Sequence, residues 1–301
     1  MNRVLILIPT LLGLVTFLFI LIRLIPGDPA RVLAGLMASE EDVELIREQL
    51  GLNKPLYVQY FTYMANLFTF NLGVSARTDS PVLYEVMARL PNTLALALSS
   101  TALAVALGVP LGVFAASRKS SRLDTLVSTF SIVGISLPTY WLGLIMITIF
   151  AVELHLLPAG GYGTPAHFIL PTVTIALFLM AFIVKITKAS VIDSMEKEYV
   201  VTARSKGLTE RVILYKHVLR NALIPVITII GLQFGSLLGG AVITETIYAW
   251  PGLGRLIIDA INNRDYPMVQ ESIFIFALLY ALVNLITDLI YTIVDPRVRL
   301  G

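Results

Sequence analysis

The chain has 301 residues, of which 56% are hydrophobic and 14% are charged, whereas soluble domains carry about 25% charged residues. Water is therefore not the main solvent of this protein. The absence of cysteine excludes disulfides, thiol nucleophiles and cysteine-based metal sites, and the net charge of +2 gives no reason to expect nucleic acid as a partner.

Six apolar runs predict transmembrane helices, because a helix of about 20 apolar residues crosses a bilayer core. The first run, 4–22, follows Arg3 but is longer than the apolar part of a secretory signal, which has about 7–15 residues. Pro26-Gly-Asp-Pro29 follows it in place of a cleavage site, so we predict a retained transmembrane helix over residues 1–26. The other uncharged runs span 90–117, 125–152, 154–184, 221–244 and 272–287, the last extending past Asp288 to about residue 294.

The connection after the first helix, residues 27–89, is predicted to be an external segment. Its acidic stretch Glu40-Glu41-Asp42-Val43-Glu44 indicates a short solvated helix that ends before Gly51. Residues 90–301 then form a core of five transmembrane helices. Glycines and prolines between residues 158 and 165 are typical of a loop, so the helix in that run is expected from about residue 168.

The basic residues predict the orientation, because short cytoplasmic loops collect Lys and Arg. With the N-terminus inside, 14 of the 22 basic residues lie on the inner side and 13 of the 20 carboxylates on the outer side. We therefore expect an all-α, multi-pass integral membrane protein with six transmembrane helices, surrounded by membrane lipid, and with both termini in the cytoplasm.

The largest inner connection, residues 189–221, is predicted to be a helix, a glycine turn and a second helix. Tyr199, Val200, Ala203 and Leu208 are its less polar positions. Gly207 falls where a helix ends in a left-handed cap, and Thr209-Glu210 suits the start of the next helix. A compact basic knob of this kind fits a groove on a partner, although an amphipathic helix on the membrane surface has a similar pattern.

The energy source is not in this chain, because it contains no phosphate-binding GxxxxGK[ST] sequence. Energy then comes from a partner or from an ion gradient, and gradient-driven transporters usually carry ionisable residues inside their spans. Asp288 is the ionisable residue that we place deep within a span, one turn from Asn284. A hydrogen bond to a neighbouring helix, or a position near the inner water boundary, is favoured for it over ion coupling.

Small residues recur at Gly231, Gly235 and Gly239, and again at Gly108 and Gly112, in the spacing that lets helices approach closely. This pattern indicates either a pore-lining or subunit-facing helix, or ordinary packing within the chain. Prolines that permit kinks interrupt or begin four of the spans, at Pro110, Pro138, Pro171 and Pro225.

The three histidines, His155, His167 and His217, are dispersed, and none is paired with another ligand at helical spacing. A metal site is therefore not expected. All three lie in loops rather than inside facing spans, so an intramembrane Ser-His protease is also disfavoured. We expect no catalytic residue and no cofactor.

The inner loop resembles the "EAA" loop of ABC importer permeases. The matching residues are Glu198-Tyr-Val-Val-Thr-Ala-Arg-Ser-Lys-Gly207 and His217-Val-Leu-Arg-Asn-Ala-Leu-Ile-Pro225, with Ala203 and Gly207 at the family's second alanine and its glycine. Val201 and Thr202 replace the family's Glu and first Ala. Further segments resemble the peptide and nickel branch of the family: Pro26–Pro29, Leu50–Pro55, Asn71–Ser75, Arg89–Leu94, Glu245–Gly254, Arg264–Pro267 and Asp295–Arg299.

This resemblance implies a type I importer permease in a bacterial inner or plasma membrane. Its implied partners are a second homologous permease, two ATP-binding subunits that hydrolyse ATP, and an external or periplasmic solute-binding protein. The implied ATPase-coupling residues are Glu198, Tyr199, Ala203, Arg204, Gly207 and Leu208. Trp250-Pro251-Gly252 is then either a plain helix connection or an external lip that contacts the binding protein.

The resemblance makes the expected function the import of dipeptides or oligopeptides, delivered by the binding protein and driven by ATP. Nickel or glutathione import by a permease of the same family is the alternative. A secondary transporter is the alternative from another class of protein, and an intramembrane enzyme ranks below it. Nickel gains no support from ligand chemistry, because the histidines do not converge and thiols are absent.

Overall fold

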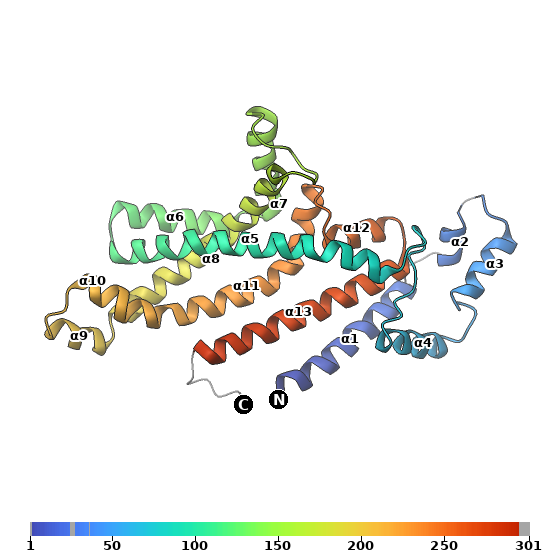
Figure 1. Cartoon of the computed structure of the whole chain (residues 1–301), viewed down its shortest axis with the longest axis horizontal. Helices are drawn as coiled ribbons and strands as arrows, with labels where there is room; N and C mark the ends of the chain where they lie inside the picture. Colours follow the sequence, from blue (N-terminus) through green and yellow to red (C-terminus); the bar gives the residue numbers. More distant parts are fainter. Residues whose placement is uncertain (1, 25–27, 36, 295–301) are drawn as a thin grey trace. The chain divides into compact units, whose positions relative to one another are not determined.

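The fold is helical throughout the part of the chain that the structure describes (Figure 1). This computed structural model describes residues 2–24, 28–35 and 37–294, with the side chains of 2–7, 29, 32–33, 238–240, 288 and 290–294 left out. The helices are α1 (Asn2–Leu24), α2 (Pro29–Ala34), α3 (Glu40–Gln49), α4 (Leu56–Phe68), α5 (Val82–Ser117), α6 (Arg122–Ser136), α7 (Thr139–Met146), α8 (Pro165–Met195), α9 (Glu198–Ser205), α10 (Glu210–Val212), α11 (Leu219–Ile247), α12 (Leu253–Asn262) and α13 (Tyr266–Val294). Two π-helical segments, η1 (Ile147–Glu153) and η2 (Ile213–Val218), continue α7 and α10.

The chain divides into two compact units. Unit 1 comprises Met1–Pro91 and Gly252–Ala281, and unit 2 comprises Asn92–Pro251 and Leu282–Gly301. The predicted first helix and external segment thus fall together in unit 1, with α12 and the start of α13 added from the far end of the sequence.

Four helical stretches of the described residues are long and apolar enough to cross a membrane: Val82–Ser117, Pro165–Met195, Glu210–Leu237 and Tyr266–Thr287. Joining α6 to the helix made of α7 and η1 gives a fifth candidate span, and Ile8–Leu24 of α1 is a shorter apolar helix. These helices confirm an all-α membrane protein. The count of six spans and the cytoplasmic position of both termini stay predictions.

The run 125–152, which we expected to form one span, is broken in the middle. α6 and the α7–η1 helix meet at an angle of 105°. Leu137, the residue before Pro138, has extended backbone angles, φ −83° and ψ 127°. Proline disfavours the helical conformation in the residue before it, so Pro138 accounts for the position of the break.

Three helices extend further than their apolar runs predicted. α5 begins at Val82, α8 continues to Met195, and the helix that leads into α11 begins at Glu210. Charged residues such as Glu85 and Lys188 lower hydrophobicity but do not end a helix, because they are good helix formers. The inner connection between α8 and α10 is therefore shorter than the predicted segment 189–221.

In unit 2, α8 is the most buried candidate span and packs against α6, α7 and α11. Gly112 of α5 lies so close to α8 that a Cβ atom there would stand 2.6 Å from the Thr187 side chain and 2.9 Å from the Val184 carbonyl oxygen. Gly134 of α6 approaches Ala181 of α8 in the same way, at 2.8 Å. At these two glycines, close approach between helices of one chain is what the small residue permits.

Unit 1 has its own apolar core. Buried residues come from α1 (Val15 and Ile22), α4 (Leu67), α12 (Leu253) and α13 (Met268), with others around them. The acidic helix predicted after residue 39 is present as α3, with a capping box between Ser39 and Asp42, and Gly51 follows it with φ +65°. The amide and hydroxyl of Ser39 hold the pKa of Asp42 below its ordinary value.

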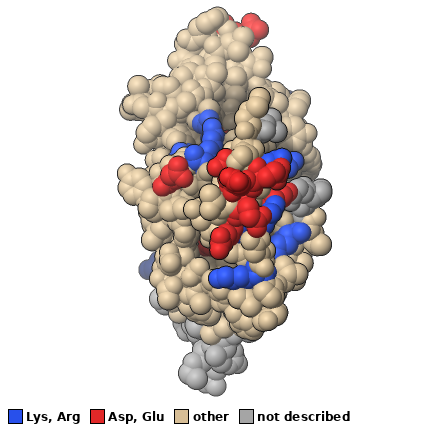
Figure 2. Space-filling view, turned by 90° about the vertical axis from the view of Figure 1, so that its right-hand side faces the viewer, with Lys and Arg blue, Asp and Glu red and all other residues tan. Residues whose placement is uncertain are grey.

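Charged side chains concentrate on the side of unit 1 that carries α2 and α3. Figure 2 shows this side, where carboxylates gather between basic groups. Arg47 pairs with both Asp28 and Glu44, and Arg31 pairs with Glu40 at 2.7 Å. These exposed pairs order the surface but contribute little stability each.

Candidate functional site

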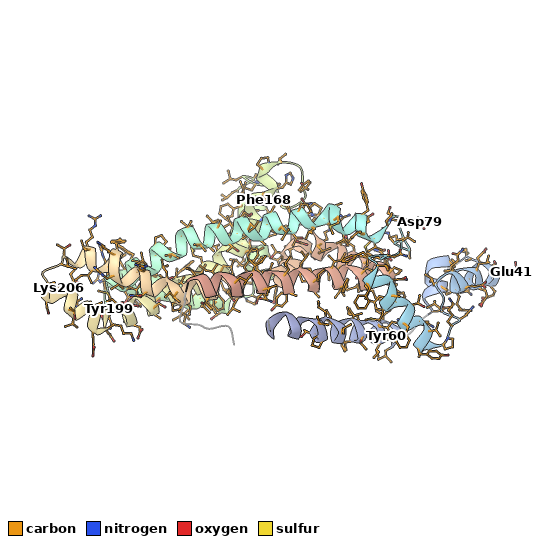
Figure 3. All side chains as sticks on the ribbon, turned by 60° about the horizontal axis from the view of Figure 1, so that its bottom comes forward. Glu41, Tyr60, Asp79, Phe168, Tyr199 and Lys206 are labelled. Carbon is orange, nitrogen blue, oxygen red and sulfur yellow. The ribbon has the colours of Figure 1, made fainter. Side chains whose placement is uncertain are left out.

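The segment from α9 through η2 forms the predicted helix, glycine turn and helix. The α9 helix ends with a Schellman motif, in which the Leu208 amide donates to the Ala203 carbonyl oxygen (3.3 Å) and the Gly207 amide to that of Arg204 (2.9 Å). Gly207 has φ +78°, the left-handed conformation expected of it. Figure 3 shows Tyr199 and Lys206 on this part of unit 2.

The inner face of α9 is held by an apolar cluster. Val200 and Ala203 are buried against the end of α5, the end of α8 and η2. The buried members of the cluster are Val113, Ala116, Val191, Val200, Ala203, Ile213, Val218 and Ala222. The α9 helix therefore packs on the ends of α5 and α8 and on η2, which leads into α11.

The outer face of the same segment is apolar and exposed. Val201 is 58% exposed and Tyr215 is 59% exposed, and Tyr199, Leu208 and Val212 are also exposed. Exposed apolar groups of this kind mark contact surfaces for a protein or a membrane. The sequence pattern led us to Tyr199 and Leu208 but not to Val201, Val212 and Tyr215. The helical spacing of the buried residues Val200 and Ala203 leaves Val201 on the exposed side of α9, and that spacing would have indicated Val201 as a surface residue.

Charges around the turn are paired within the segment. Arg204 at the end of α9 makes two hydrogen bonds to the Glu210 carboxylate at the start of α10, at 2.7 and 3.1 Å. This ion pair bridges the two helices across the Gly207 turn. Glu198 lies at the start of α9, where its charge is favourable to the helix dipole, and its side chain is exposed.

A buried ion pair connects α8 to α6 in the same unit. The Lys188 ammonium contacts Asp124 and donates to the Ser128 hydroxyl at 2.8 Å. Asp124 also accepts a hydrogen bond from the Ser120 amide, at 3.0 Å, in the turn between α5 and α6. Polar contacts thus join α8, α6 and the turn that precedes α6.

The glycines predicted as packing or gate residues, Gly231, Gly235 and Gly239, differ in what surrounds them. A Cβ atom on Gly231 would stand 2.0 Å from Thr287 of α13, so this glycine packs helices within the chain. Gly235 is buried, and the surroundings of Gly239 lie outside the described residues. A role for the three glycines in gating stays a prediction.

Two of the three residues of the predicted external lip, Trp250 and Gly252, are buried. The Trp250 indole is buried and donates to the Asn92 carbonyl oxygen at 3.2 Å. It packs edge-to-face with Tyr162 and at a tilt against Phe168, at centroid distances of 5.1 and 5.3 Å. Gly252 is buried at the start of α12, and Pro251 is partly exposed. A contact of this turn with a binding protein stays a prediction and depends on the exposed atoms of Pro251.

Two carboxyl groups lie within long helices, those of Asp288 in α13 and Glu245 in α11. The side chain of Asp288, in α13, lies outside the described residues. Glu245 of α11 is fully buried and accepts a hydrogen bond from the Thr93 hydroxyl of α5 at 2.6 Å. The sequence reasoning missed Glu245, because we ended the apolar run at residue 244 and assigned the charged residue to the loop.

Unit 2 also contains a cavity of about 450 Å³ between the α6–α7 bend, α8 and α11. Ser136, Thr139, Gln233, Ser236 and Thr244 contribute polar groups to its mainly apolar wall, and no acidic or basic residue is among the described residues that line it. Such a wall offers hydrogen bonds without a fixed charge. It suits a solute that passes rather than one that is held tightly.

Comparison with solved structures relates this fold to importers. An inward-facing structure of the MetNI methionine ABC transporter aligns with a TM-score of 0.60 at 20% identity, covering 71% of this chain and 98% of that chain. An amino acid ABC transporter solved with histidines aligns with a TM-score of 0.52 at 22% identity, covering 72% of this chain and 95% of the other. At these identities the likeness shows the fold alone.

The sequence matches define the class. Residues 108–300 match the family described as "Binding-protein-dependent transport system inner membrane component", and residues 1–97 match "Binding-prot-dependent transport system membrane comp, N-term". The chain therefore belongs to the inner-membrane components of binding-protein-dependent transport systems.

Individual relatives narrow the family further. A dipeptide transport system permease protein, DppB of Alkalihalophilus pseudofirmus, is 40% identical and covers 99% of this chain and 98% of its own length. A glutathione transport system permease protein, GsiC of Escherichia coli, is 42% identical and covers 99% of this chain and 97% of its own length. The protein is a permease subunit of the dipeptide and oligopeptide family of ABC importers, in the inner membrane, and works with an ATP-binding subunit and a substrate-binding protein.

Proposed function

We propose that this permease imports short peptides, delivered from outside by the binding protein and driven by ATP hydrolysis in partner subunits. The observation that carries the proposal is the α9 segment, with its exposed apolar outer face and its buried inner face on the ends of α5, α8 and η2. A partner that grips the outer face moves the ends of the helices that enclose the cavity of unit 2. ATP-driven closure of the partner is then coupled to opening and closing of that cavity.

The cavity wall supports peptides as substrates. Serine, threonine and glutamine side chains can exchange hydrogen bonds with successive peptide groups, and the described part of the wall contains no charged residue that would hold a peptide by a strong ion pair. The dipeptide permease DppB is a relative over nearly the full length of both chains. Glutathione, itself a tripeptide, is the second candidate substrate, because the similarly related GsiC belongs to a glutathione system.

Within the complex, we place a second homologous permease beside this chain and two ATP-binding subunits beneath the pair. The cavity of unit 2 is only partly enclosed by this chain. A homologous permease facing it would complete an enclosed pathway, and each permease would present one α9 segment to one ATP-binding subunit. The predicted orientation, with both termini and the α9 segment in the cytoplasm, is required by this arrangement.

The orientation is checked with single cysteines, since the chain contains none of its own. We expect Ser205→Cys on α9 to react with a membrane-impermeant maleimide only from the cytoplasmic side, and Glu41→Cys on α3 to react in intact cells. Both side chains are exposed. Labelling of Ser205→Cys in intact cells, with the membrane shown to be sealed, would contradict the proposed topology.

Transport itself is tested in vesicles that contain the permease co-purified with its partners. Uptake of radiolabelled dialanine should require the loaded binding protein outside and ATP inside, and vanadate should abolish it. Uptake of glutathione in place of dialanine under the same conditions would move the substrate to the second candidate. Dialanine uptake by the permease alone, driven by an ion gradient without ATP, would instead support the secondary transporter.

A further inference from the structure

Unit 1 contains a polar cavity of about 210 Å³ that neither coupling nor the proposed pathway uses. It lies between the end of α1, the turn after α3, α4 and the start of α13. Its volume is below the range of about 300–1,000 Å³ that is usual for drug-sized ligands, so it suits a smaller molecule.

The cavity wall includes a buried acidic side chain, that of Glu271. Glu271 is 6% exposed, and its Oε2 atom has no hydrogen-bond partner among the described residues. The Tyr63 hydroxyl and the Gln270 amide nitrogen line the same cavity and also lack a partner in the described part of the chain. Buried polar groups are nearly always paired, so three unpaired groups around one cavity indicate that something polar occupies it.

A positive group lies elsewhere on the wall. The Arg23 guanidinium donates through Nε and Nη2 to Gln59 Oε1, at 3.2 and 3.0 Å, and lies over the Phe19 ring. Gln59 in turn donates to the carbonyl oxygens of Leu52 and Lys54, at 3.1 and 2.7 Å. Arg23 forms no ion pair with a carboxylate in the described ranges, so its charge is held in a fixed position and is not neutralised.

The pKa of Tyr63 is affected by both Glu271 and Arg23. Burial raises the pKa of the Tyr63 phenol, the Glu271 carboxylate adds to the rise, and the Arg23 guanidinium opposes it. The cavity is therefore lined by a carboxyl group, a guanidinium and a phenol. Among the described residues no hydrogen bond or ion pair joins Glu271 to Arg23, so both can contact a ligand in the cavity that they line.

We propose that this cavity binds a small zwitterion that carries a primary ammonium group, with the ammonium at Glu271 and the anionic group facing Arg23. A metal ion is a poor match, because no group of three or more acidic or histidine side chains is present among the described residues. Free amino acids and dipeptides have this pairing of charges, and so does the headgroup of phosphatidylethanolamine. The inference does not depend on which solute the permease transports.

The first arm of the test places the full-length chain in nanodiscs of phosphatidylcholine, which offers no primary ammonium. Binding of dialanine is measured by isothermal titration calorimetry against N-acetyl-dialanine, which lacks the ammonium. We expect the acetylated peptide to bind about tenfold more weakly or worse, because a charge-assisted hydrogen bond is lost. This comparison uses the unmodified protein and does not depend on how a variant folds.

The second arm adds phosphatidylethanolamine and measures its retention on the purified chain by native mass spectrometry. Glu271→Gln should reduce dialanine binding in the first arm, or lipid retention in this one, by about tenfold. Glu48→Gln, an exposed position on α3 away from the cavity, should match the unmodified chain in both arms. Equal binding of the two peptides together with lipid retention that does not depend on Glu271 would overturn the proposal.

Discussion

Gly207→Val is expected to abolish most transport while leaving the amount of assembled complex unchanged. Gly207 has φ +78°, and no atom stands within 4 Å of the position that a Cβ would take. The substitution therefore adds no clash, but a β-branched residue in the left-handed conformation costs about 1–2 kcal/mol. That cost lowers the population of the native turn by a factor of about 5–30 relative to relaxed alternatives.

The Gly207→Val substitution should weaken the coupling between ATP hydrolysis and peptide uptake. A relaxed turn breaks the hydrogen bonds that end α9 and separates Arg204 from Glu210. The outer face of α9 is then misplaced for its partner, although Val200 and Ala203 still pack on the long helices. Peptide uptake and the stimulation of ATP hydrolysis by loaded binding protein should both fall about tenfold in vesicles with matched amounts of complex.

Gly207→Asn is the matched control, because asparagine tolerates the left-handed conformation better than other residues with a side chain. It should keep most of the uptake and most of the stimulated ATP hydrolysis. If the Val variant performs as well as the unmodified chain, the Gly207 turn has no part in coupling. If Val and Asn fail equally, the side chain itself and not backbone strain is responsible.

Gly112→Leu is expected to prevent stable folding of unit 2. Even a Cβ at this position would stand 2.6 Å from the Thr187 side chain and 2.9 Å from a backbone oxygen of α8, so the two helices must separate. Overpacking of a core costs about 1–3 kcal/mol, and here the backbone has to move because a rotamer change of Thr187 does not clear the carbonyl. We expect a large loss of monodisperse protein in detergent and a lower unfolding temperature of what remains.

The control for this variant is Gly13→Leu in α1, a helical glycine with no atom within 4 Å of its Cβ position. Yield and unfolding temperature of Gly13→Leu should be close to those of the unmodified chain. Fluorescence-detected size-exclusion chromatography measures both at small scale. Wild-type behaviour of Gly112→Leu would mean that α5 and α8 are not packed as closely as the structure has them.

Local sequence determined much of the protein. The apolar runs located the long helices, since a helix in a bilayer needs a continuous apolar stretch. Glycine at position 207 and the capping box at Ser39 each fixed a helix end, because these features depend on the backbone of a few neighbouring residues. The turn in the candidate site was therefore predictable, as were the buried positions Val200 and Ala203.

Contacts between distant segments were decided only by the tertiary structure. Trp250 was predicted at an external lip, yet Tyr162, Phe168 and Asn92 bury it, and none of them is near it in sequence. Proline at position 138 explains where the helix breaks, but nothing in the sequence indicated the 105° angle or the packing of both α6 and α7 against α8. Spacing alone left the role of Gly231 open, and its approach to Thr287 of α13 identified helix packing.

The buried polar groups show the same limit for function. Residues 23, 63 and 271 surround one cavity because α1, α4 and α13 come together in unit 1. In the sequence, nothing distinguishes any of them from other polar residues. Their importance comes from the unpaired Tyr63 hydroxyl and Glu271 carboxyl oxygen and from the Arg23 charge on the same cavity wall, which neighbours up to about 250 positions away bring together. The sequence by itself determined which segments are helices and where they cap, whereas the energy of burying a charge is defined only once the helices have packed.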